Sequence, residues 1–278
     1  GTDFRHVNTL RTSEPFGYMW ECPDLAEVDG QTLLIACPQG IPHETYRYAN
    51  AHQCGCFPLA GALGDKAELG DFQPFDYGFD YYAARTLKAA DGRVLLFGWM
   101  GMSETDYGRN PCADHGWDQV IAMPRELHWK DGALRQTPLR ELQALRGEKQ
   151  TAEGARGFTA HSRRCELVLE VKPGTDLTLR LFEDASLHYR AGEGVLTLEA
   201  GTLCGAKRTV RRMRLDRLES LDLYLDGSTL EVFVNGGQAV LTSRLFGQAD
   251  AVTVEPFAGR VAWYPMKGFV LEEAESLG

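Results

Sequence analysis

The sequence has 278 residues, 44% of them hydrophobic and 24% charged, which is enough for two globular domains with sizeable cores and excludes a mainly disordered chain. The net charge is −10 and the basic residues are scattered, so no positive stripe is available for a phosphate backbone. Apolar runs such as 33–37 and 94–99 fall far below the ~20 residues of a membrane helix. We therefore expect binding to neither nucleic acid nor membrane.

Seven cysteines form an odd count at irregular spacing, which favours free thiols and a reducing compartment. The sequence begins Gly1-Thr2-Asp3, with no initiator Met and no basic and apolar regions typical of a signal peptide. These features predict a cytoplasmic protein and allow for a start upstream of Gly1.

The first half is expected to be mostly β-structure. Asp-Gly pairs, which suit tight hairpins, lie between short apolar runs at Asp29-Gly30, Asp91-Gly92 and Asp131-Gly132. Their irregular spacing of roughly 40–60 residues, with long loops between them, fits the blades of a β-propeller. Leucines at three-residue spacing within 138–148 predict one short amphipathic helix, and a polar linker follows.

The second half changes to a period of two, with apolar residues alternating with polar ones. The alternating sets are Leu167/Leu169/Val171, Leu177/Leu179/Leu181, Leu221/Leu223/Leu225 and Leu230/Val232/Val234. The pairs Pro173-Gly174, Asp226-Gly227 and Asn235-Gly236 supply turns between such strands. We predict an all-β protein with a propeller portion over 1–145, a linker over 146–156 and an antiparallel β-sandwich over 157–278. No catalytic cluster is evident in the sandwich.

The segment Trp20-Glu21-Cys22-Pro23-Asp24-Leu25 places an acid among apolar and aromatic residues just before a predicted strand. Apolar neighbours disfavour the ionised form of a carboxyl, which is what a general acid at neutral pH needs. Spacing alone favours a solvated or ion-paired role for Glu21, which is the usual role of an isolated Glu near a strand.

An ordered series of motifs begins with Glu21-Cys22-Pro23-Asp24-Leu25 and covers nearly the whole chain. The first half continues with Cys37-Pro38-Gln39-Gly40, Asp76-Tyr77-Gly78-Phe79-Asp80-Tyr81-Tyr82-Ala83, Gly98-Trp99-Met100, Gly116-Trp117 and Met123-Pro124-Arg125-Glu126-Leu127. The second half adds Asp226-Gly227-Ser228, Glu231-Val232-Phe233-Val234-Asn235 and Leu241-Thr242-Ser243-Arg244. The series resembles glycoside hydrolase family 32, the β-fructosidases that include invertases, levanases, inulinases and sucrose-6-phosphate hydrolases.

The resemblance implies a five-bladed propeller followed by a β-sandwich, with Glu21 as general acid/base and an Asp nucleophile opposite it. The family's nucleophile motif, Asn-Asp-Pro-Asn-Gly, and its Arg-Asp-Pro motif both precede the Glu-Cys segment, and neither occurs in this sequence. The chain therefore corresponds to about blades three to five plus the sandwich. An upstream segment, a second chain or self-association is expected to complete the propeller.

The resemblance also implies a set of sugar-binding residues. Asp80 and Tyr82 match a segment whose polar groups face the sugar pocket, and Trp99 matches an aromatic that faces the fructosyl ring. Cys22 follows the acid and is expected to tune its environment without attacking anything. Packing within a blade is the alternative role for Tyr82 and Trp99.

Two other groups have structural interpretations. Arg125 and Glu126 are expected to hold blade to blade, or propeller to sandwich, by ion pairing. His52, Cys54, Cys56, Cys112 and His115 are metal-ligand types that a zinc site could use, although Cys-x-Cys spacing suits a core strand equally well. The resemblance implies neither a metal nor a cofactor.

The sequence favours hydrolysis of sucrose or sucrose-6-phosphate, because the Cys-Pro-Gln-Gly segment, the free cysteines and the lack of a signal peptide are similar to the cytoplasmic bacterial branch of the family. A secreted-type fructan hydrolase is the alternative enzyme. A non-catalytic carbohydrate-binding or interaction fragment is the alternative of another class, supported by the missing nucleophile. An arabinoside- or xyloside-cleaving propeller is disfavoured by the Glu-Cys-Pro-Asp and Glu-Val-Phe-Val-Asn motifs.

Overall fold

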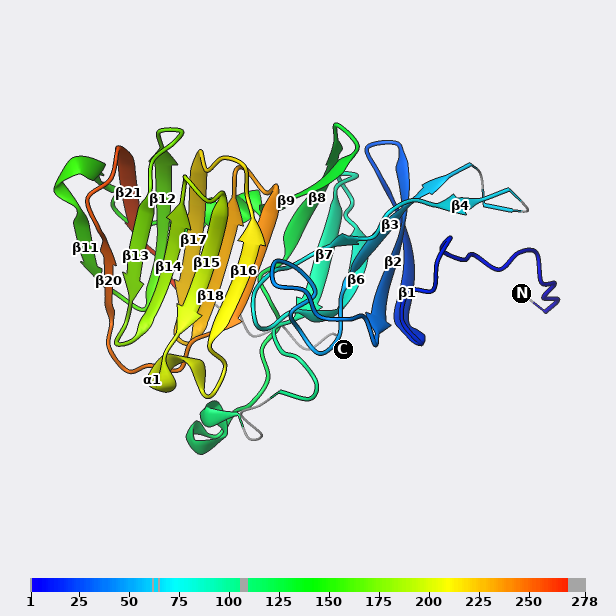
Figure 1. Cartoon of the computed structure of the whole chain (residues 1–278), viewed down its shortest axis with the longest axis horizontal. Helices are drawn as coiled ribbons and strands as arrows, with labels where there is room; N and C mark the ends of the chain where they lie inside the picture. The colour runs from blue at the N-terminus through cyan, green and yellow to red at the C-terminus, as the bar shows by residue number, and fades with distance from the viewer. Residues whose placement is uncertain (1, 62, 65, 106–109, 270–278) are drawn as a thin grey trace, which may run out of the picture.

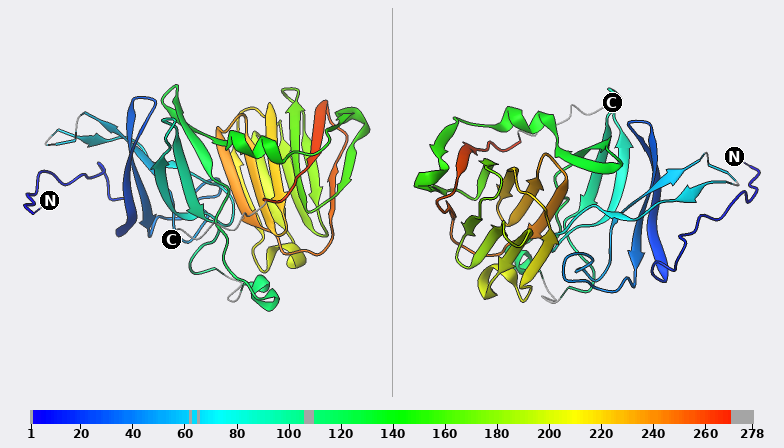
Figure 2. Two further views of the ribbon diagram at one scale, coloured as in Figure 1. Left: turned by 180° about the vertical axis from the view of Figure 1, so that it is seen from behind. Right: turned by 45° about the horizontal axis from the view of Figure 1, so that its top comes forward.

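The computed structural model describes residues 2–61, 63–64, 66–105 and 110–269, and its regular structure is nearly all β-strand. Figure 1 shows an elongated molecule with two smaller sheets at one end and a larger two-sheet body at the other. The view from behind in Figure 2 shows the same two parts side by side. An all-β protein was predicted, and this is confirmed.

The first half forms two antiparallel sheets. The first contains β1 (Met19–Val28), β2 (Gln31–Gln39), β3 (Gly55–Ala60) and β4 (Glu68–Leu69), with β5 (Gln73–Pro74) also paired to β3. The second contains β6 (Tyr82–Lys88), β7 (Val94–Trp99), β8 (Arg125–Lys130) and β9 (Ala133–Pro138), and the short 3-10 helix η1 (Pro111–His115) lies between β7 and β8.

The three Asp-Gly pairs join β1 to β2, β6 to β7 and β8 to β9, as the hairpin prediction required. At two of these turns the Asp itself has a positive φ, 50° at Asp29 and 54° at Asp131, which is the geometry of a turn that matches strand twist. The resemblance implied about three blades, whereas the described residues of this half form two sheets.

The stretch predicted as a helix and a linker is more structured than expected. The 3-10 helix η2 (Arg140–Leu145) is tighter and shorter than the predicted amphipathic helix. Within 146–156, β10 (Gln150–Glu153) pairs with the last strand of the sandwich and is followed by the 3-10 helix η3 (Gly154–Arg156). The connection therefore supplies an edge strand to the sandwich.

The sandwich consists of two six-stranded antiparallel sheets, in the orders β10-β21-β12-β17-β18-β19 and β11-β20-β13-β14-β15-β16. The strands of the first are β12 (Arg164–Val171), β17 (Ser220–Asp226), β18 (Thr229–Val234), β19 (Ala239–Arg244) and β21 (Gly259–Pro265). The strands of the second are β11 (Phe158–His161), β13 (Leu177–Leu181), β14 (Ala185–Arg190), β15 (Val195–Ala200), β16 (Val210–Arg214) and β20 (Ala251–Val254), and the helix α1 (Thr202–Gly205) follows β15.

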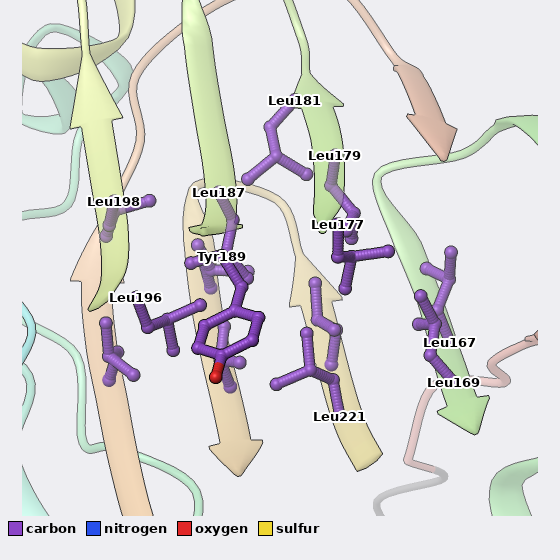
Figure 3. Close-up of a cluster of buried hydrophobic side chains, with 14 of the residues drawn as sticks. Leu167, Leu169, Leu177, Leu179, Leu181, Leu187, Tyr189, Leu196, Leu198 and Leu221 are labelled. Carbon is purple, nitrogen blue, oxygen red and sulfur yellow. The ribbon is translucent and has the colours of Figure 1, made fainter. Parts of the chain in front are cut away.

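The residues predicted to alternate inward form the sandwich core. Leu167, Leu169, Leu179, Leu181 and Leu221 are fully buried, and Figure 3 shows their side chains meeting between the two sheets. Because successive side chains of a strand point to opposite faces, these leucines can all face one core.

The two halves meet along β19. Segment 76–80 runs beside this strand, with the Tyr77 amide donating to the Val240 carbonyl at 2.8 Å and the Asp80 amide donating to the Thr242 carbonyl at 3.0 Å. A Cβ added at Gly78 would lie 2.1 Å from the Thr242 carbonyl oxygen, so this contact requires glycine.

Buried charges cross the same interface. The Arg125 guanidinium is 0% exposed and lies 2.8 Å from Asp76 and 3.6 Å from Glu231, which belongs to the sandwich. It also donates to the Thr242 hydroxyl at 2.6 Å. The prediction that Arg125 joins propeller to sandwich by ion pairing is confirmed. Glu126 instead pairs with Arg93 at 2.8 Å and Arg140 at 3.3 Å, on its own side of the interface.

Within the described residues, no helix is long and apolar enough to cross a membrane. All seven cysteines are described, and each is free.

Candidate active site

Glu21 stands at an irregularity in β1. It pairs with Cys37 of β2, and the register then shifts before Asp24 pairs with Ile35. Cys22 has a φ of 51°, and Pro23, which has no N–H to donate, completes the bulge. Bulges of this kind redirect side chains, so Glu21 is turned relative to the regular part of the strand.

A second bulge lies opposite, at the start of β6. Its register with β7 shifts between Tyr82 and Arg85, and Ala83 has a φ of 53°. The positive φ of Ala83 and that of Cys22 are unusual for residues with a Cβ and indicate that the surrounding contacts hold both bulges in place.

The two bulges are tied together by side-chain hydrogen bonds. The Tyr82 hydroxyl donates to Glu21 Oε2 at 2.9 Å. The amide and hydroxyl of Thr86 donate to Asp24 Oδ2 at 2.8 and 2.7 Å, and Arg85 donates to the Pro23 carbonyl. The Asp of the Glu-Cys-Pro-Asp motif therefore clamps the first sheet to the second beside Glu21.

The contact to Glu21 is extended by a short polar chain. Gln39 donates to the Tyr82 hydroxyl at 3.3 Å, and the Tyr18 hydroxyl donates to Gln39 at 2.9 Å. Burial raises the pKa of Tyr82 well above its ordinary value, so this phenol stays protonated and remains a donor. Tyr82 is only 5% exposed, and its oxygen is committed to Glu21 and Gln39.

Trp99 lies beside this group as the last residue of β7, where it pairs with Tyr82. Its ring is partly exposed, and its Nε1 donates to the Gln119 side chain at 2.6 Å, which fixes the ring orientation. The structure thus brings together Glu21, Cys22, Tyr82 and Trp99, four of the five predicted site residues.

Asp80 is placed elsewhere. It is 0% exposed, forms an ion pair with Arg208 and accepts a hydrogen bond from the Arg244 amide at 2.7 Å. Both arginines belong to the sandwich, so the carboxylate takes part in the interface between the two halves. These contacts do not support the predicted sugar contact, because both use Oδ2 of a carboxylate that is fully buried, while Oδ1 is buried with no hydrogen-bond partner among the described residues.

Sequence reasoning passed over three polar residues of this site: Asp24, Gln39 and Gln119. The first two stand inside motifs that were already noted, at the third position after Glu21 and within Cys-Pro-Gln-Gly, so their polarity between apolar residues was an available signal. Gln119 carries no such signal, because only the return of a long loop brings it to Trp99.

The metal alternative gains no support from the structure. Among the residues described, no three His, Cys, Asp or Glu side chains gather closely enough to hold a metal ion. Cys112, one of the candidate ligands, contacts Arg244 of the sandwich, with an Arg244 nitrogen 2.9 Å from its Sγ.

Comparison with known proteins agrees with this geometry. Residues 2–138 match the glycosyl hydrolases family 32 N-terminal domain, and residues 193–263 match the glycosyl hydrolases family 32 C-terminal domain. The chain belongs to glycoside hydrolase family 32. The architecture of this family, an N-terminal propeller with a C-terminal β-sandwich, accounts for the two halves described above.

Individual family 32 proteins cover most of this chain. A sucrose-6-phosphate hydrolase of Bacillus subtilis is 36% identical over 243 residues, 84% of this chain and 50% of its own length. A solved sucrose-6-phosphate hydrolase of Lactobacillus gasseri has a TM-score of 0.82 at 25% identity and covers 92% of this chain and 56% of its own.

A family 32 β-fructofuranosidase of Bombyx mori, solved in complex with sucrose, has a TM-score of 0.75 at 26% identity and covers 91% of this chain and 55% of its own. The chain thus spans about half the length of the family 32 relatives that it matches.

Proposed function

We propose that the protein containing this chain is a retaining β-fructofuranosidase of the sucrose-6-phosphate hydrolase type, with Glu21 as its general acid/base. The observation that carries the proposal is the placement of Glu21 on a bulge, held at 2.9 Å by a buried tyrosine that remains protonated. A carboxyl held in place by a hydrogen bond, in a family of glycosidases, is suited to proton transfer.

In the proposed mechanism Glu21 first protonates the oxygen that leaves the fructosyl carbon. An Asp from an upstream segment attacks that carbon, at a separation of about 5–5.5 Å between the two carboxyl groups, as retaining hydrolysis requires. Glu21, now ionised, then takes a proton from the water that releases fructose. Tyr82 donates to the ionised carboxylate, which stabilises that form and holds the carboxyl in position for the second step.

The neighbouring residues take supporting roles in this proposal. Trp99 offers a partly exposed indole face for the C–H surface of a sugar ring. Cys22 borders the acid as a soft, weakly polar neighbour, and Tyr82 positions the carboxyl rather than contacting sugar. We assign Asp80 to the interface between the two halves.

We propose further that an upstream polypeptide completes the propeller. Apolar side chains at the outer edge of the first sheet support this, since Tyr18 is 75% exposed, Met19 40% and Leu25 45%. Figure 1 shows the N-terminal stretch and the β3–β4 connection extending past this edge, and Asn8 of the former donates to the Gly64 carbonyl of the latter at 2.7 Å. Exposed edges and apolar patches of this kind are liabilities in water unless another segment covers them.

The isolated chain 1–278 is expected to show no hydrolysis of sucrose or sucrose-6-phosphate above the uncatalysed rate. Glu21 can donate a proton, but retaining chemistry also requires a nucleophile, and the family's motif for it is absent from this sequence. The measurement is fructose release by the isolated chain, and then by the chain with the upstream segment added in trans.

Activity of the isolated chain that disappears when one of its own Asp residues is replaced would show that the active site lies elsewhere. A gain of activity on addition of the upstream segment is the expected result.

The full-length protein is expected to prefer sucrose-6-phosphate over inulin or levan in kcat/KM, which tests the proposed substrate class. The similarity to sucrose-6-phosphate hydrolases supports this choice. A site that pairs with a phosphate rejects substrates lacking it by leaving polar groups unsatisfied, an effect of several kcal/mol. Fructose release from each substrate at matched enzyme concentration provides the comparison, and efficient attack on the polymers would assign the protein to the fructan hydrolases.

We place the protein in the cytoplasm on the strength of its seven free thiols.

A further inference from the structure

Three thiols, those of Cys22, Cys37 and Cys54, lie close together near the candidate acid Glu21. Cys37 Sγ is 3.3 Å from Cys54 Sγ, and the Cys37 thiol also interacts with that of Cys22. Cys37 is the cross-strand partner of Glu21, whereas Cys22 follows Glu21 directly and is partly exposed. The proposed hydrolytic mechanism uses none of these sulfur atoms as a reacting group.

The ladder between β2 and β3 places Cys37 and Cys54 opposite each other. Ala36 pairs with Gly55, and the Gln53 amide donates to the Pro38 carbonyl at 2.9 Å on the other side of the cysteine pair. Because hydrogen-bonded and non-hydrogen-bonded positions alternate, Cys37 and Cys54 occupy a non-hydrogen-bonded position, where Cα atoms are typically about 4.5 Å apart. That spacing lies within the range of about 4.4–6.8 Å that a disulfide accepts.

The contacts of Cys37 ease the ionisation of its thiol, although the residue is 0% exposed. Contact with the Cys54 thiol, and with the backbone amides of Ala83 and Ala84 in the β6 bulge, lowers the pKa of Cys37 although burial opposes this. Burial raises the pKa of both Cys54 and Cys22. Cys56, two residues beyond Cys54, is a contrasting case, because burial alone raises its pKa to about 12.

We propose that Cys37 and Cys54 are a site of reversible oxidation, at which a peroxide converts the two thiols to one disulfide next to Glu21. The Cys37 thiolate attacks one oxygen of hydrogen peroxide, and the O–O bond breaks. Hydroxide departs, and Cys37 becomes a sulfenic acid. The Cys54 sulfur then attacks the Cys37 sulfur and displaces water. Two thiols are oxidised by two electrons, and one peroxide is reduced to two waters.

The test uses the reduced full-length protein under native conditions, treated with a stoichiometric amount of hydrogen peroxide, alkylated and digested. Trypsin leaves Cys37 on peptide 12–47 and Cys54 on peptide 48–66, and a second cut after Glu27 separates Cys37 from Cys22. The expected product is a link between these two peptides that dithiothreitol reverses, and because 48–66 also carries Cys56, the variants below identify Cys54 as the partner. Cys54→Ser is expected to lower its yield more than about tenfold, to background. Cys56→Ser, a matched loss of a buried thiol on the same strand, is expected to leave the yield unchanged.

A Cys22–Cys37 link in place of the expected one would overturn the proposal. So would Cys37 and Cys54 thiols that remain alkylatable once the Cys22 thiol has been consumed, or a link whose yield depends on Cys56. These readouts are masses of peptides, so they stand or fall independently of the proposed hydrolytic activity.

Discussion

Glu21→Gln in the full-length protein is expected to lower kcat for sucrose-6-phosphate by about 10²–10⁴, the usual contribution of a positioned general acid/base. Glutamine keeps the size of the side chain and can still accept from Tyr82, so the loss measures proton transfer more than packing. The measurement is steady-state kinetics of fructose release. Glu27→Gln is the matched control, because Glu27 is an exposed acid on the same strand, and we expect it to leave kcat unchanged.

The leaving group offers a second readout for the same variant. A fructoside whose leaving group is already acidic departs without protonation, so the first step should be largely restored for Glu21→Gln. Azide, which attacks the fructosyl intermediate without needing a base, should then restore the second step. Near-normal turnover of sucrose-6-phosphate by Glu21→Gln would show that another residue is the acid.

Arg125→Met is expected to lower the free energy of unfolding by about 3–5 kcal/mol, since it removes one partner from a buried charge network. Asp76 and Glu231 would be left beside an apolar side chain, each at most 4% exposed. Urea denaturation gives the change. Arg180→Met is the control, because Arg180 pairs with Glu255 in an exposed setting, at 71% and 36% exposure, where such pairs contribute about 0–1 kcal/mol.

The destabilisation by Arg125→Met should depend on pH. Burial already raises the pKa of Glu231 to about 7 and raises that of Asp76 despite the nearby guanidinium. Without Arg125 both carboxyls should bind protons more tightly when folded than when unfolded, so stability should be greater at low pH and fall as pH rises through the folded values. The variant should therefore lose less stability at pH 5.5 than at pH 8. An equal loss of stability at pH 5.5 and pH 8 would mean that the destabilisation does not come from leaving these two carboxyls without the Arg125 charge.

Local patterns in the sequence determined much of the fold. The Asp-Gly hairpins and the alternating leucines of the sandwich depend on residues a few positions apart, where backbone preference and side-chain periodicity act directly. The linker was less predictable, because β10 becomes a strand only by pairing with β21, more than a hundred residues later. A polar stretch such as 150–153 has no periodic signal of its own.

The sequence by itself determined the candidate acid, since the Glu-Cys-Pro-Asp motif and the ordered motifs after it pointed to Glu21. The tertiary structure alone decided what surrounds it. The contact between Tyr82 and Glu21 spans 61 positions and the pair of Asp80 with Arg208 spans 128, so neither follows from local spacing. Asp80 and Tyr82 belong to one motif but lie in different parts of the structure. Tyr82 begins a strand beside β1, whereas Asp80, two residues earlier, still runs along β19.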